Sequence, residues 1–130
     1  MKIDIKDPPR RFAVGNSEKF DMADCANLSL EPNEQVTLTT PAGGEYDVAR
    51  KSWGFYATPS LNGRLPQFGL RAVLIKNLGT LRFFVLLVEQ ACEADFDAYC
   101  AQENLSVVSW LDSAERLSFL ESALEAARAG

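Results

Sequence analysis

The segment of residues 70–89 limits the folds open to this chain more than any other part of the sequence. Residues 70–76 and 81–89 are rich in Val, Ile, Leu and Phe, which favour strands. The four residues between them, Asn77-Leu78-Gly79-Thr80, are typical of a hairpin turn. Residues 83–88 are apolar at every position, so we expect this strand to be central in its sheet and covered on both faces.

A second hairpin is predicted upstream of the first. Residues 35–40 alternate Val and Leu with Thr, which indicates a strand with one face in water. The sequence Pro41-Ala42-Gly43-Gly44 forms a turn, because glycine tolerates positive φ. Residues 45–49 then return as the second strand of this hairpin.

The first thirty residues have a weaker pattern. Residues 2–6 alternate charged and apolar side chains, which predicts a short edge strand. The sequence Asp7-Pro8-Pro9 is expected to end it. Residues 10–18 read as irregular, and residues 19–30 as one or two strands.

The C-terminal third is predicted to contain two helices. Residues 93–103 carry Phe96, Tyr99 and Cys100 on one stripe, and Asn104 suits the C-terminal cap. A strand follows at residues 105–110. The last helix begins at a capping pair, Asp112 and Glu115. Its apolar side consists of Leu117, Leu120, Leu124 and Ala127. The prediction is one α+β domain, residues 1–130, with a mostly antiparallel mixed sheet built from two hairpins and two late helices.

Composition excludes several classes of function. With 47% hydrophobic and 24% charged residues, the chain can form a core. The N-terminus lacks a signal-peptide pattern and no apolar run could span a bilayer, so a cytoplasmic location without membrane contact is expected. Three cysteines without CxxC spacing predict free thiols. Without histidine, a metal site and Ser-His or Cys-His nucleophilic pairs are disfavoured, and no cofactor is expected.

Charge is distributed unevenly along the chain. The net charge is -5, yet residues 1–83 carry +2 and residues 84–130 carry -7. Six cations and no acid lie between Val48 and Val88. This asymmetry favours an anionic small ligand, or a homodimer in which unlike patches meet. A pI near 4.7 argues against a nucleic-acid partner.

The cation-rich region begins with a segment that we predict to be a structured binding loop, residues 50–64. It combines cations, aromatic rings and turn-forming residues, which could hold an anion while a ring stacks on a base or sugar. The candidate ligand-binding residues are Arg50, Lys51, Trp53, Tyr56, Thr58, Ser60, Asn62 and Arg64.

Three interpretations of this segment stay open. The first is a small binding or accessory protein for an anion such as a nucleotide-sugar or sugar phosphate. The second is a small sugar-modifying enzyme that uses Asp47, Lys51 or Tyr56 as acid or base. The third is a purely structural protein-interaction module, since clusters of aromatic residues and Arg also mark interfaces. Trp53 and Phe55 could equally be core residues, Asp47 could simply pair with an arginine, and Asn62-Gly63 could be an ordinary turn.

Three strings carry a resemblance to a known group of proteins. They are KSWGFYATPSLNGRL (residues 51–65), FGLRAVLIKN (residues 68–77) and VVSWLD (residues 107–112). They resemble small uncharacterised bacterial proteins encoded among surface-polysaccharide and flagellin-glycosylation genes, over residues 27–112. The resemblance brings no catalytic residue. It implies a cytoplasmic accessory role near nucleotide-sugar metabolism.

Overall fold

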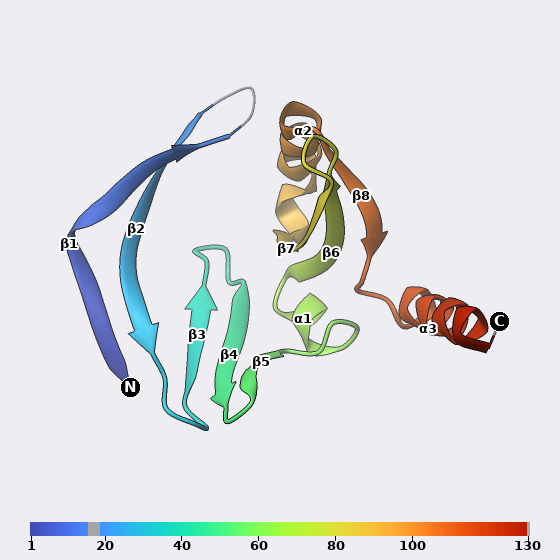
Figure 1. Ribbon diagram of the computed structural model, residues 1–130, viewed down its shortest axis with the longest axis horizontal. Helices are drawn as coiled ribbons and strands as arrows, with labels where there is room; N and C mark the ends of the chain where they lie inside the picture. The colour runs from blue at the N-terminus through green and yellow to red at the C-terminus, as the bar shows by residue number, and fades with distance from the viewer. Residues whose placement is uncertain (16–18, 130) are drawn as a thin grey trace.

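The computed structural model describes residues 1–15 and 19–129, and it is α+β with every strand pair antiparallel. The strands form three separate sheets, of order β1-β2, β3-β4-β5 and β7-β6-β8, where the sequence predicted one mixed sheet. Figure 1 shows them side by side along the chain, with the helices late in the sequence. The strands are β1 (Lys2–Val14), β2 (Phe20–Ser29), β3 (Gln35–Thr39), β4 (Glu45–Lys51), β5 (Gly54–Thr58), β6 (Leu70–Asn77), β7 (Arg82–Glu89) and β8 (Leu105–Trp110). The helices are α1 (Arg64–Gln67), the 3-10 turn η1 (Gln90–Cys92), α2 (Glu93–Glu103) and α3 (Ala114–Ala129).

The N-terminal hairpin is longer than the sequence indicated. Strand β1 continues through Asp7-Pro8-Pro9, where a break was predicted, and includes residues 10–14, which were read as irregular. Prolines are tolerated here because the register shifts between Ile5 and Arg10, so the ladder does not need their missing N–H groups. Residues 16–18 lie outside the described residues. In Figure 1 the hairpin bows outward in its middle and bends back toward α2 at its far end, where the Phe20 ring centroid lies 5.7 Å from that of Tyr99.

The middle sheet contains the predicted hairpin and one strand more. Strands β3 and β4 pair as expected around the turn at residues 41–44, where Gly43 has φ +96°. Strand β5 then pairs with the other edge of β4. The segment predicted as a loop is therefore the end of β4, a tight turn, β5, a second turn and α1.

The third sheet has β6 at its centre, and this overturns the prediction for residues 83–88. Strand β6 pairs with β7 on one side and β8 on the other. Strand β7 is an edge strand, with exposed side chains at Phe83, Phe84 and Val85. Its second half does reach the core: Val88 is buried, and Leu86 and Leu87 pack against the two core clusters. An apolar run indicates that a strand is buried, but it does not give the order of the strands in the sheet. Here β8, which comes later in the sequence, pairs with the second edge of β6 and makes β6 the central strand.

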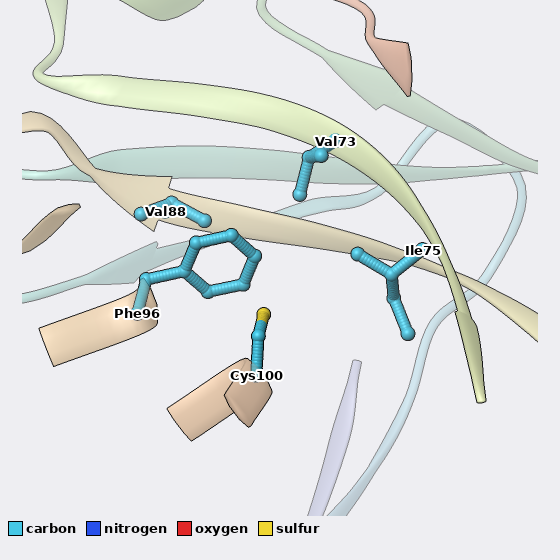
Figure 2. Packing of buried hydrophobic residues seen from close by; sticks show 5 residues of the cluster. All are labelled: Val73, Ile75, Val88, Phe96 and Cys100. Atoms are coloured by element: carbon cyan, nitrogen blue, oxygen red, sulfur yellow. The ribbon is translucent and has the colours of Figure 1, made fainter. Parts of the chain in front are cut away.

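The main core lies between this sheet and α2. Val73 and Ile75 from β6, Val88 from β7, and Phe96 and Cys100 from α2 pack together (Figure 2). Burial raises the pKa of the Cys100 thiol, which is therefore an apolar core group and not a thiolate. Asn104 ends α2 in the left-handed conformation, φ 58°, and confirms the predicted cap.

A smaller core cluster joins α1 to the same sheet. Leu65 in α1 and Leu70 and Ala72 in β6 are buried together, with Tyr46 of β4 packed against them. This contact links the middle sheet to the third sheet. It also holds the turn that precedes α1 against the third sheet.

Helix α3 begins one residue later than the predicted capping pair. The Ser113 hydroxyl accepts a hydrogen bond from the Arg116 N–H at 3.1 Å, so Ser113 is the capping residue. Asp112 instead binds Arg71. The apolar stripe of Leu117, Leu120, Leu124 and Ala127 is helical, as predicted.

Candidate functional site

The two cations at the end of β4 lie on opposite faces of the middle sheet. Arg50 is paired with Phe55 and Lys51 with Gly54, and neighbouring residues on a strand point to opposite sides. The Arg50 guanidinium donates to the Leu30 carbonyl at 2.8 Å. The Lys51 ammonium donates to Asn33 Oδ1 at 3.0 Å. Both cations therefore fasten this hairpin to the turn that precedes β3.

The aromatic residues of the segment are exposed. Trp53, Phe55 and Tyr56 have exposed fractions of 69%, 67% and 53%. The interpretation of Trp53 and Phe55 as core residues is therefore wrong. The Trp53 and Tyr56 rings meet edge to face, with centroids 6.5 Å apart and an interplanar angle of 70°. Gly54, φ +147°, makes the turn that brings β5 back along β4.

The residues after β5 form an ordinary turn, as the sequence allowed. The Ser60 hydroxyl accepts a hydrogen bond from the Arg64 N–H at 3.0 Å, and the Ser60 carbonyl accepts from the Leu65 N–H. A side chain at Gly63 would collide with Ser60 Oγ at 2.6 Å. The Arg64 guanidinium lies over the Phe68 ring, 5.5 Å from its centroid. Thus Ser60 and Arg64 serve the local structure, while Asn62 is exposed in the turn.

The proposed acid and base residues share one face of the middle sheet but are spread along it. Asp47, paired with Thr58, and Lys51 are four residues apart on β4, about 13 Å at the rise of a strand. Tyr56 is paired with Ala49, between them. Asp47 accepts a hydrogen bond from the Thr37 hydroxyl at 2.6 Å, and it forms no ion pair with an arginine among the described residues. This spacing does not bring a carboxylate and an ammonium to one reacting atom.

The described cavities lie elsewhere. The larger, about 710 Å³, opens between the end of β1, the β6–β7 hairpin and α2. It is mainly apolar, with Phe84, Leu86 and Tyr99 in its lining, and Glu103 is the charged residue among the described residues that line it. The smaller, about 300 Å³, lies at the start of α3. None of the candidate ligand residues lines either cavity.

Sequence reasoning missed the ionic cluster around Arg71. The Arg71 guanidinium binds Asp112 through Nε and Nη2 and binds Glu93 through Nη1 at 2.6 Å. It also lies 3.9 Å from the centroid of the Trp110 ring. The hydrogen bonds that the Arg71 guanidinium donates to Asp112, and then to Glu93, raise its pKa. No local pattern marks these residues as neighbours, because they are far apart in the sequence. Arg71 lies on β6, Glu93 on α2, Trp110 at the end of β8 and Asp112 just after it.

No protein-family model matches the sequence, and no curated protein or solved structure is significantly similar to it. Among the described residues, no helix is both long and apolar enough to cross a membrane. In the same part of the chain, no three His, Cys, Asp or Glu side chains are grouped as metal ligands. The predicted free thiols are confirmed: Cys25 is exposed, Cys92 partly buried and Cys100 buried, all unbridged.

Proposed function

We propose that the chain is a protein-interaction module and that strand β5 is its contact surface. The observation that carries this proposal is a group of exposed aromatic residues, Phe55 and Tyr56 on the short edge strand β5 and Trp53 in the turn before it. Aromatic residues are enriched at the centres of interfaces, because each ring buries a large area at small conformational cost. None of these three aromatic residues lines either of the two cavities described above. The rings therefore lie on an open surface and not in a pocket for a small ligand.

The backbone of β5 supports the same proposal. Within the described residues β5 pairs only with β4, so the N–H and C=O groups of its other edge point away from the sheet. An extended segment of a partner protein can add to such an edge as a further strand. Main-chain hydrogen bonds then supply affinity. Phe55 on one face and Tyr56 on the other supply specificity, because each would contact alternate side chains of the added strand.

The test compares two exposed aromatic residues on two edge strands. A photoreactive amino acid at position 53 cross-links the partner in cells, and the purified partner is then titrated against the chain by calorimetry. We expect Phe55→Asp to weaken binding by about tenfold or more, as for an interface anchor. Phe83→Asp is the matched control, since Phe83 is also an exposed phenylalanine, on edge strand β7. Equal binding by both variants would exclude β5 as the contact surface.

An anionic ligand is the second candidate, and it stays a prediction. One observation favours it: Lys51 is paired with Gly54 on the same hairpin as the exposed Trp53–Tyr56 ring pair, so a cation and a stacking surface are close together. A thermal-shift screen of nucleotides, nucleotide-sugars and sugar phosphates tests it. A specific ligand at a hundredfold excess over its Kd stabilises a protein by about 2.7 kcal/mol. The stabilisation should disappear in Lys51→Ala, and it should survive in Lys2→Ala.

A further inference from the structure

Helix α3 has no extensive contact with any other element of the described chain. Figure 1 shows it projecting beyond β8, away from the three sheets. A helix of 16 residues is only marginally stable by itself in water, since most helices in proteins depend on the packing of an apolar face. A well-formed helix in this position therefore needs a surface to pack against.

The apolar residues of α3 have the spacing of a coiled-coil seam. Leu117, Leu120, Leu124 and Ala127 follow one another at intervals of three, four and three residues. This is the a and d pattern of a heptad repeat, in which each side chain inserts between residues of a facing helix. Leu124 is 66% exposed, and Leu117 and Leu120 are only partly covered. The seam is present, and no described element of the chain packs extensively against it.

We propose that α3 pairs with α3 of a second copy of this chain, as a parallel two-stranded coiled coil on a twofold axis. A second copy is the occupant that the seam fits, because Leu117, Leu120 and Leu124 match their own symmetry mates. This contact is separate from the surface proposed on β5, and neither depends on the other.

The charges beside the seam select the parallel orientation. With Leu117 and Leu124 at a, Arg116 occupies g and Glu121 occupies the following e position. In a parallel pair, Arg116 lies opposite Glu121 of the second copy, twice by symmetry. An antiparallel pair with the same seam brings the two Glu121 carboxylates together. In the described chain neither side chain takes part in an ion pair, so both are free to pair between copies.

The experiment measures the mass of the full-length chain by sedimentation equilibrium at low salt over micromolar concentrations. The wild type should be a dimer. Leu124→Asp should raise the dimer Kd by about 100-fold or more, because it puts two carboxylates into the seam. Phe119→Asp is the matched control: Phe119 is also exposed on α3 but lies off the seam, and this variant should remain a dimer. A monomeric wild type would overturn the proposal and assign the seam to another protein.

A charge swap tests the orientation with variants that keep the seam intact. Arg116→Glu and Glu121→Arg should each weaken the dimer about threefold to tenfold at low salt. The double variant should restore it. Circular dichroism of each variant confirms that the helices persist. A double variant weaker than both single variants would overturn the parallel arrangement, and equal dissociation of Leu124→Asp and Phe119→Asp would overturn the seam.

Discussion

Arg71 and Asp112 are 41 residues apart in the sequence, and the Arg71 Nε donates a hydrogen bond to Asp112 Oδ2 across 2.5 Å. The bond joins the central strand β6 to the segment between β8 and α3. Glu93, at the start of α2, binds the same guanidinium. One arginine thus holds together three elements that pack around the main core.

Asp112→Ala should lower the free energy of unfolding by about 1.5–3 kcal/mol, the usual effect of losing a hydrogen bond to a charged group. Both side chains are more than two-thirds buried, so solvent screens the interaction only in part. Urea denaturation measures the change. Asp97→Ala is the control, because Asp97 is exposed on α2, and it should change stability by less than about 0.5 kcal/mol. Equal midpoints for the two variants would show that the cluster adds nothing to stability.

Substitutions in the third sheet should separate its centre from its edge. Ile75 on β6 is 1% exposed. Ile75→Ala should lower the free energy of unfolding by about 2–5 kcal/mol, because it leaves a buried cavity behind. Val85 on β7 is largely exposed, and Val85→Ala should cost less than about 0.5 kcal/mol. Chemical denaturation of both variants provides the comparison. A larger loss for Val85→Ala than for Ile75→Ala would place β7 at the centre after all.

Acid should loosen the N-terminal hairpin at Asp24. This residue lies at the register shift and binds Lys6 and Arg10 of the facing strand. The hydrogen bond from Lys6 is the largest cause that holds the pKa of Asp24 below its ordinary value of 3.8. A carboxyl group whose pKa is lowered in the folded state stabilises the fold at pH values above its ordinary pKa. This stabilisation is lost as the pH falls through the lower pKa of the folded state.

Hydrogen exchange of the β1 and β2 amides, followed as pH falls, measures this effect after correction for intrinsic rates. Protection of the wild type should decrease below the ordinary pKa of the carboxyl, and Asp24→Asn should lack that step. Asp4→Asn is the control, because Asp4 is an exposed carboxylate on β1 without an ion pair to any described residue. An acid step that survives in Asp24→Asn would assign the pH dependence to another group.

Local patterns predicted the two late helices, α2 and α3, and the two hairpins well. Helix α2 ends at Asn104, and strand β8 begins next to it, as the sequence indicated. These features depend on residues within a few positions of each other: the Phe96 stripe, the left-handed cap and the glycines of a turn. The N-terminal strand was mispredicted at Pro8 and Pro9, because a bulge that accommodates proline depends on the register of the facing strand.

The candidate site shows the same difference between what local sequence predicts and what depends on the tertiary structure. The sequence identified the cations and aromatic rings of residues 50–64 but not their directions. Arg50 and Lys51 lie on opposite faces because β4 continues through Lys51, two residues beyond the end that the sequence predicted for this strand. The exposure of Trp53 and Phe55 could not be predicted from the sequence. Alternation along a strand does not show whether another element of the fold covers that strand.

The sequence by itself determined the α+β class, the turns at residues 41–44 and 77–80 and the apolar seam of α3, since each depends on contacts or periodicity between residues close in the sequence. Only the tertiary structure decided that β6 and not β7 is central, that the strands divide into three sheets, and that Arg71, Glu93 and Asp112 meet. Pairing between distant segments is a choice among many partners of similar composition. It is settled by the packing of the whole chain, which local periodicity does not encode.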